Sequence, residues 1–213
     1  MALRTILPSL CTVALLAGAA NMATAEEGSG SSHGLWLSFQ TLPTDLEIDI
    51  SDDDGDSLTI ADDEEYESAS RFAFGYRYRR GSQMAFVFST GLAFSQEEFD
   101  DSGATWDITG TGVVLEPGIS WLWENGFQLD AVGILGLGSS TADIKGYDEE
   151  DGVYAEFGLA VRPAYQAAGG FRVYADLGYL NRVQSWELEG TDDLTLDFDS
   201  SGFTIGAGVG YSF

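Results

Sequence analysis

Ten charged residues have a spacing that would let them pair, or conduct ions, inside a folded core. They lie in segments where bulky apolar residues alternate with small ones, and each has the parity of the small residues. Buried charges must pair, because an unpaired one is strongly destabilising. The pattern indicates either a salt-bridged plug, which we favour, or a narrow ion path or gate. The ten residues are Arg71, Arg77, Arg79, Glu116, Asp130, Glu156, Arg162, Arg172, Asp176 and Arg182.

An acidic stretch suggests a second chemistry, the binding of a hard cation. The sequence from Asp52 to Asp56 places four aspartates around Gly55, and Ca²⁺ prefers several carboxylate oxygens. The EF-hand pattern fails, because Ile50 stands where its first aspartate belongs and no glutamate ends the loop. We interpret the stretch as an acidic hairpin tip. Asp52, Asp54 and Asp56 are the candidate ligands of a divalent cation, and no other cofactor is expected.

Catalysis of the Ser-His-acid type would require His33, because it is the only histidine in the chain. A lipid hydrolase of the Ser-His-acid type needs its histidine on the same rim as a serine and an acid. His33 precedes the first predicted strand, and no serine lies in a G-x-S-x-G motif. We therefore expect an interfacial role for His33 and a protein that is not an enzyme.

Period-2 alternation identifies the elements that hold the charged residues. Bulky apolar side chains have one parity, and Gly, Ala, Ser or a charged residue has the other, as in a strand with two different faces. Pro117 is unfavourable in a paired strand. The eight predicted strands cover residues 34–40, 71–79, 84–95, 112–121, 127–138, 153–165, 171–182 and 203–213.

The connections between these strands alternate in length. Short links follow the second, fourth and sixth strands, and long acidic segments follow the others. Membrane barrels have short periplasmic turns and longer extracellular loops. Small residues of the polar parity suit a narrow interior, and aromatic residues near the short links suit a membrane interface. The sequence therefore predicts an all-β fold, an eight-stranded antiparallel up-and-down transmembrane β-barrel with short periplasmic turns and long acidic extracellular loops.

The first 25 residues have the layout of a secretory signal peptide. Arg4 precedes an apolar stretch, and Ala-Thr-Ala at 23–25 fits a cleavage site. A lipoprotein anchored on Cys11 is disfavoured, because Leu10 stands where a small residue is expected. Cys11 is the only cysteine, so we expect no disulfide in the exported protein. The expected division is a cleaved signal peptide over 1–25, a periplasmic segment over 26–34 and the barrel over 35–213.

The end of the chain carries a family resemblance. The last strand ends on Phe213, with Tyr211 two residues before it. This ending resembles the C-terminal assembly signal of bacterial outer-membrane barrels. The mature chain as a whole is similar to the eight-stranded OmpA-like, OmpX-like and opacity-protein barrels. The resemblance implies that the barrel-assembly machinery reads Tyr211 and Phe213, and that the protein lies in the cell outer membrane among its lipid and lipopolysaccharide.

The charge balance limits the partners. The chain carries 35 acidic and 9 basic residues, a formal net charge of −26. Such a surface repels nucleic acid and suits divalent-rich salt or an extracellular cationic partner. We expect a non-enzymatic surface protein that acts in envelope integrity or adhesion through acidic extracellular loops. The alternative is a small porin-like conduit for ions or small solutes through a charged lumen.

Overall fold

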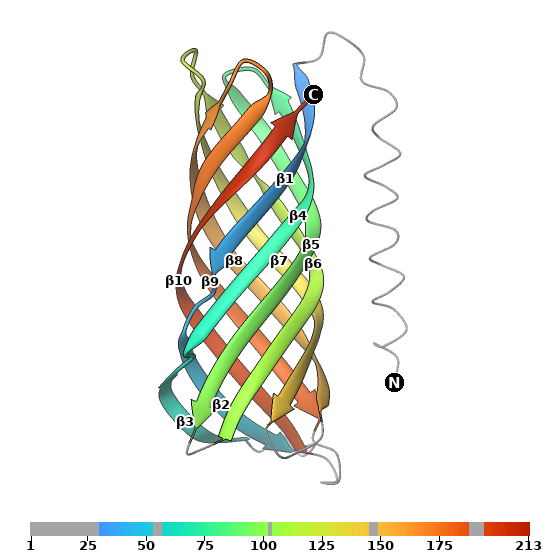
Figure 1. Ribbon diagram of the computed structural model, residues 1–213, viewed down its shortest axis with the longest axis vertical. Coiled ribbons are helices and arrows are strands. Elements are labelled where there is room, and N and C mark those ends of the chain that lie inside the picture. The colour runs from blue at the N-terminus through green and yellow to red at the C-terminus, as the bar shows by residue number, and fades with distance from the viewer. Residues whose placement is uncertain (1–29, 53–56, 102–103, 145–148, 188–193) are drawn as a thin grey trace.

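The computed structural model describes residues 30–52, 57–101, 104–144, 149–187 and 194–213. Eight antiparallel strands follow one another around a closed barrel, and β10 pairs back onto β1 (Figure 1). The predicted fold class is confirmed. Within the described ranges, no helix is long and apolar enough to cross a membrane. The strands are β1 (Ser31–Thr41), β2 (Asp45–Asp52), β3 (Ser57–Glu65), β4 (Ser68–Gly81), β5 (Met84–Asp101), β6 (Ala104–Leu122), β7 (Phe127–Ile144), β8 (Glu150–Gln166), β9 (Phe171–Glu187) and β10 (Leu194–Ser212).

Most strands are longer than the alternation predicted. Residues 96–101 continue β5, residues 104–111 begin β6, and residues 139–144 continue β7. The acidic segments expected as loops are thus partly strand. Within the first of them, β2 and β3 form a hairpin, and the period-2 alternation of Leu46 and Ile48 with acidic residues is the sequence signal for it.

The strand β10 has two partners on the same edge. Its C-terminal half pairs with β1 from Gly206 to Ser212, and its N-terminal half pairs with β2 from Leu194 to Ser200. Between them, the hydroxyl of Thr41 donates to the carbonyl of Ile205 at 3.2 Å and accepts from its N–H at 3.1 Å. The barrel wall is therefore closed by two different ladders on this edge of β10, and the residues between the two ladders pair with β9 on the other edge.

Tight turns join the strands at one end of the barrel, called here the turn end. Gly126 and Gly170 have φ of 83° and 84°, a conformation in which a side chain is strained. The N–H of Gly126 donates to the carbonyl of Trp123, and that of Gly170 to the carbonyl of Ala167, each at 3.0 Å. The opposite end, which carries β2 and β3, is called the loop end.

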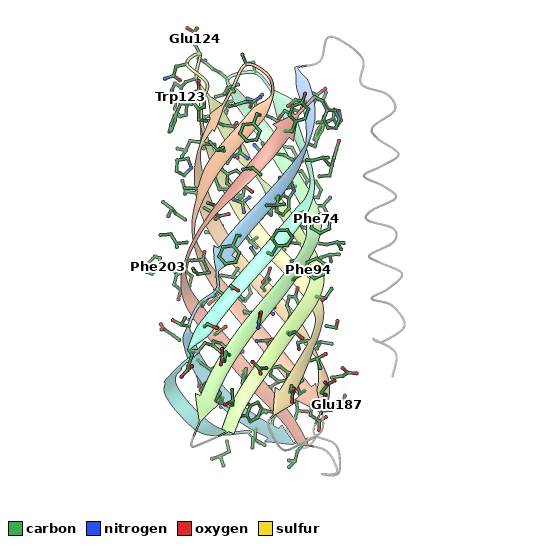
Figure 2. The ribbon with its side chains drawn as sticks, viewed as in Figure 1. Phe74, Phe94, Trp123, Glu124, Glu187 and Phe203 are labelled. Carbon is green, nitrogen blue, oxygen red and sulfur yellow. The ribbon has the colours of Figure 1, made fainter. Side chains whose placement is uncertain are left out.

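An apolar belt covers the outside of the barrel. Phe74, Phe94 and Phe203 project from the wall, and Trp123 lies at the turn end (Figure 2). Leu159, on the same outer face, is 72% exposed. Large exposed apolar surfaces of this kind mark contact with a partner or a membrane. A barrel with lipid-facing apolar side chains and a polar interior matches the pattern of membrane barrels.

The two faces of the strands exchange character near the loop end. On β5, Phe94 points outward, whereas Phe99 points inward and is 1% exposed. On β10, Phe203 is outward and 86% exposed, whereas Phe198 is inward and 1% exposed. Asp197 has the outward parity on β10. The barrel is thus apolar outside and charged inside along the belt, and it reverses this arrangement at the loop end.

Candidate functional site

The lumen near the turn end is organised around Asp130. Its Oδ2 accepts from Arg77 at 2.7 Å and from Arg172 at 2.5 Å, and Gln128 donates to its Oδ1 at 2.8 Å. The Asp130 side chain is fully buried. The Arg172 guanidinium also stacks over the ring of Tyr174, 4.5 Å from its centroid. One carboxylate therefore holds two arginines from strands on other parts of the wall.

Arg162 joins two carboxylates in the middle of the lumen. Its two terminal nitrogens donate to both oxygens of Glu116, at 2.6 and 2.7 Å, in a bidentate pair. Its Nε donates to Asp176 at 2.6 Å. All three side chains are almost completely buried. Removal of Arg162 would leave two buried carboxylates without their partner.

A third group of charges lies toward the loop end. Glu156 accepts from Arg71 and, at 3.1 Å, from Arg182. Arg182 also lies 3.1 Å from Glu97, which accepts from Gln184. Every one of these side chains is buried. The lumen charges are therefore linked across the barrel in two triplets and one chain of four.

Nine of the ten charged residues predicted for the lumen are buried there, and Arg79 is half-buried near the turn end. Arg79 donates to the carbonyls of Gly81 and Ser82. Sequence reasoning missed Glu97, which is 1% exposed, because it assigned the run Gln-Glu-Glu to a loop. The parity of Ser89 and Ser95 continues to Glu97 and could have identified it.

An aromatic cluster packs inside the barrel at the loop end. The ring of Phe198 lies 5.0 Å from Trp186, 5.5 Å from Trp106 and 6.2 Å from Phe99. Tyr66 packs edge-on against Phe99. Ile108 and Leu196 belong to the same buried cluster. Packed side chains thus occupy the interior beyond the ion pairs.

Carboxylates face each other on the outer surface beyond the belt. Asp107 on β6 lies directly opposite Glu98 on β5 and Asp143 on β7. On the other side of the barrel, Asp199 and Asp197 of β10 lie opposite Glu47 and Asp49 of β2. Like charges directly opposite each other destabilise a sheet. The outer wall therefore concentrates negative charge on rigid strands.

The pKa of Asp199 provides a test of this charge. Burial, together with the neighbouring Asp197 and Asp49, raises the pKa of Asp199 above its ordinary value of 3.8. The folded chain therefore holds this proton more tightly than the unfolded chain, and stability falls as pH rises through the raised pKa. We expect Asp199→Asn to raise the urea midpoint slightly at pH 7 and not at pH 3.

Urea titrations of the refolded barrel at both pH values check this prediction, with Glu124→Gln at the turn end as the control. The effect is small because the burial of Asp199 is only partial, and the residue as a whole stays exposed to solvent, which screens its charge. An equal change of midpoint at pH 3 and pH 7 would contradict the assignment to charge.

The predicted assembly residues lie at the barrel seam. Tyr211 pairs with Leu35 of β1, and the terminal Phe213 exchanges two backbone hydrogen bonds with His33, at 2.8 and 3.2 Å. The Nδ1 of His33 contacts the hydroxyl of Tyr76, and its ring lies against Tyr76 and a second tyrosine. The prediction that His33 precedes the first strand is therefore wrong, because β1 begins at Ser31 and His33 pairs within it with Tyr78 of β4.

The candidate cation ligands are only partly visible. Asp52 ends β2, whereas Asp54 and Asp56 lie outside the described residues, as does the predicted signal peptide over 1–25. Among the residues that the structure describes, no group of three or more His, Cys, Asp or Glu is arranged to hold a metal ion. The proposed site at this hairpin tip stays a prediction.

Comparisons with solved structures find distant matches. No protein-family model matches the chain, and no curated protein matches it. Neisserial surface protein A is 13% identical, with 86% of this chain and 99% of that chain covered and a TM-score of 0.43. Ail, the attachment invasion locus protein of Yersinia pestis, is 13% identical, with 85% and 99% covered and a TM-score of 0.37. The outer membrane protease OmpT of Escherichia coli is 11% identical, with 90% and 99% covered and a TM-score of 0.41.

Proposed function

We propose that this protein is a closed β-barrel of the bacterial outer membrane that acts through its extracellular surface, without catalytic activity. The observation that carries the proposal is the filling of the lumen. Ion pairs such as Arg162 with Glu116 occupy the membrane-spanning part, and the rings around Phe198 occupy the interior beyond it. An eight-stranded barrel has an interior that side chains can fill completely. Function then falls to the outer surface.

The turn end faces the periplasm in this proposal, and the loop end faces the outside. Residues 1–25 direct export and are removed. The barrel-assembly machinery reads Tyr211 and Phe213, which lie beside β1 at the seam. The exposed aromatic side chains near the turns, such as Trp123 and Phe127, lie where the periplasmic side of the outer membrane meets water.

The outward acidic residues beyond the apolar belt at the loop end, called here the acidic rim, form the surface through which the protein is proposed to act. Rows such as Glu98, Asp107 and Asp143 are presented on rigid strands just outside the belt. Their negative field attracts divalent cations and cationic partners. Divalent cations at this level would bridge the rim to lipopolysaccharide phosphates and so contribute to envelope integrity. A cationic extracellular partner would bind the same surface in adhesion.

Single-channel recording in a planar bilayer tests the closed lumen. We expect the refolded mature protein to give no steady conductance, because buried pairs and rings leave no continuous water path. Heat-dependent gel mobility verifies that the inserted protein is folded. Steady conductance that changes with Glu116→Gln, but not with Glu124→Gln outside the lumen, would support the porin-like conduit instead.

A further inference from the structure

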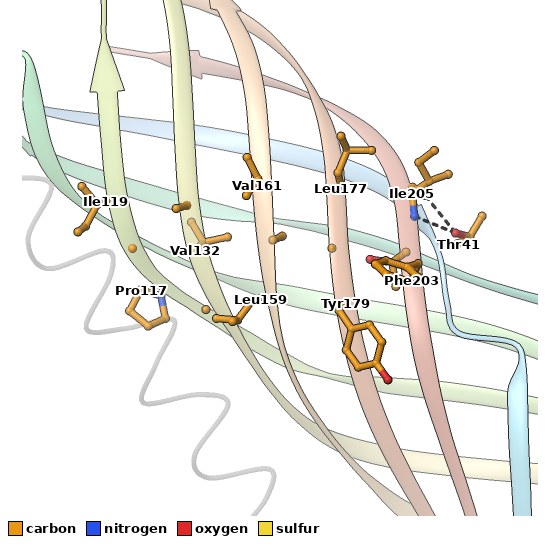
Figure 3. Close-up of a pocket in the computed structure, with 16 residues that line it drawn as sticks. Thr41, Pro117, Ile119, Val132, Leu159, Val161, Leu177, Tyr179, Phe203 and Ile205 are labelled. Carbon is orange, nitrogen blue, oxygen red and sulfur yellow. Dashed lines mark hydrogen bonds between the residues drawn. The ribbon is translucent and has the colours of Figure 1, made fainter.

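Two hollows adjoin each other on the outer wall, and they differ in polarity. The first is an apolar groove of about 1000 Å³ that crosses β6 to β10 (Figure 3). The second groove, of about 390 Å³ at the junction of β8, β9, β10 and β2, has a mixed lining of acidic, polar and apolar residues and is called here the polar groove. The two grooves lie side by side, because both are lined by residues of β8, β9 and β10.

The apolar groove follows two cross-strand rows. Residues that lie directly opposite one another on neighbouring strands form these rows. The first row is Gly133, Leu159, Tyr179 and Phe203, with Pro117 beside Gly133 at its end. The second row is Ile119, Ala131, Val161, Leu177 and Ile205. The regular pairing of β6 with β7 is interrupted at Pro117, which lies near Gly133. Five strands are crossed, so each row is about 19 Å long, four strand spacings. This length suits a hydrocarbon tail lying along the wall.

Gly133 is the hollow part of this groove. A Cβ added there would meet nothing closer than 3.8 Å, whereas a Cβ at the lumen glycine Gly138 would lie 2.3 Å from Tyr154. Gly133 has the outward parity of β7 and lies in the lipid-facing belt. The missing side chain therefore leaves room for something outside the barrel, and the position tolerates a larger residue without a clash.

The polar groove begins one row further toward the loop end. The next row is Phe157, Asn181 and Ser201, and the one after it includes Asp199 opposite Glu47. Tyr179 marks the boundary. Its ring packs edge-on against Phe203 at 5.5 Å, and its hydroxyl lies 3.4 Å from Ser201.

Main-chain groups also face this boundary. The ladder from β10 to β1 stops at Gly206, and the ladder to β2 resumes at Ser200. Ile205 directs both its N–H and its carbonyl toward Thr41 on this edge. Main-chain groups of alternate residues point to the same edge, so those of Phe203 and Ser201 point there too. The segment between β1 and β2 lies against part of this edge, because a Cβ added at Gly202 would lie 3.5 Å from the Cβ of Pro43.

We propose that the two grooves together bind one outer-leaflet glycolipid. An acyl chain lies along the apolar row past Gly133 and Tyr179. A sugar headgroup rich in hydroxyls and amides supplies donors to Asp199 and Glu47 and both donors and acceptors to Asn181. A bare phosphate headgroup is repelled by these carboxylates. The inference rests on the proposed placement of the barrel in the outer membrane.

Native mass spectrometry of the full mature barrel tests this inference. The protein is ejected from phosphatidylglycerol nanodiscs that contain a small fraction of lipid A from which both phosphates have been removed, so that its headgroup is an uncharged glucosamine disaccharide. We expect the wild type to retain one lipid A per barrel. Gly133→Leu fills the tail groove and Asn181→Val removes headgroup bonds, and each is expected to lower the retained fraction about tenfold.

Matched controls separate the site from general lipid contact. Ala175→Leu introduces the same leucine side chain on the lipid-facing wall outside the groove, and Thr109→Val removes a polar group from the outer wall elsewhere. Both should retain lipid A like the wild type. Retention of phosphatidylglycerol in place of lipid A, or equal retention by Gly133→Leu and wild type, would overturn the inference. Heat-dependent mobility verifies folding of each variant, and channel recording tests the closed lumen separately.

Discussion

Replacing Arg162 with methionine is expected to destabilise the barrel by about 3–5 kcal/mol, the range found when one partner of a buried ion pair is removed. Arg162 donates three hydrogen bonds to Glu116 and Asp176, and the variant leaves both carboxylates buried without a counter-charge. Urea titration of the protein in lipid vesicles, followed by tryptophan fluorescence, measures the loss.

A compensated variant distinguishes lost charge balance from lost packing. Arg162→Met combined with Glu116→Gln and Asp176→Asn removes the whole charged triplet, and we expect it to recover most of the stability, because neutral groups carry no buried charge. Arg80→Met, an exposed arginine near the turn end, is the matched control and should be close to neutral. A loss in Arg162→Met no larger than in Arg80→Met would mean that water already reaches the pair.

Replacing Phe198 with alanine is expected to cost about 3–5 kcal/mol, as for other large aromatic side chains removed from a packed core. Phe198 is 1% exposed and contacts Trp186, Trp106 and Phe99. The same urea titration measures the change. Phe198→Leu keeps most of the apolar volume, so we expect it to cost less than half as much.

The outcome for Phe198 bears on how the lumen is closed. If Phe198→Ala were nearly neutral, the aromatic cluster would not be a packed core, and the interior at the loop end would be open to water. The side chain of Trp186, which also lies in this cluster, would then be accessible to a soluble fluorescence quencher in the wild type.

The alternation of residues was sufficient to predict the barrel and most of its lumen charges. Arg71 and Glu156 could both be assigned to the interior from parity alone, because each has the parity of the small residues on its strand. Their pairing could not be predicted, since β4 and β8 are not neighbours. Which charges meet across a lumen depends on the tilt and stagger of all the strands, which no single segment encodes.

The extent of the strands was predicted less well. Glu97 and the β2 residue Leu46 belong to regular strands, but the acidic residues around them are equally typical of solvated loops. The alternation also changes face where the barrel leaves the apolar belt, as Phe99 illustrates. A prediction that requires one apolar face along a whole strand places the end of that strand too early, because the outward side chains become polar where the strand leaves the apolar belt.

This exchange of faces limits how far the protein can slide along the membrane normal. A shift by one residue pair is about 6.6 Å along a strand. Moving inward would carry outward carboxylates such as Asp107 into hydrocarbon, which is unfavourable at that depth. Moving outward would carry Phe94 and Phe203 into water. Where the hydrocarbon core of the membrane is thicker or thinner than the apolar belt, the lipid rather than the barrel should therefore deform to remove the hydrophobic mismatch.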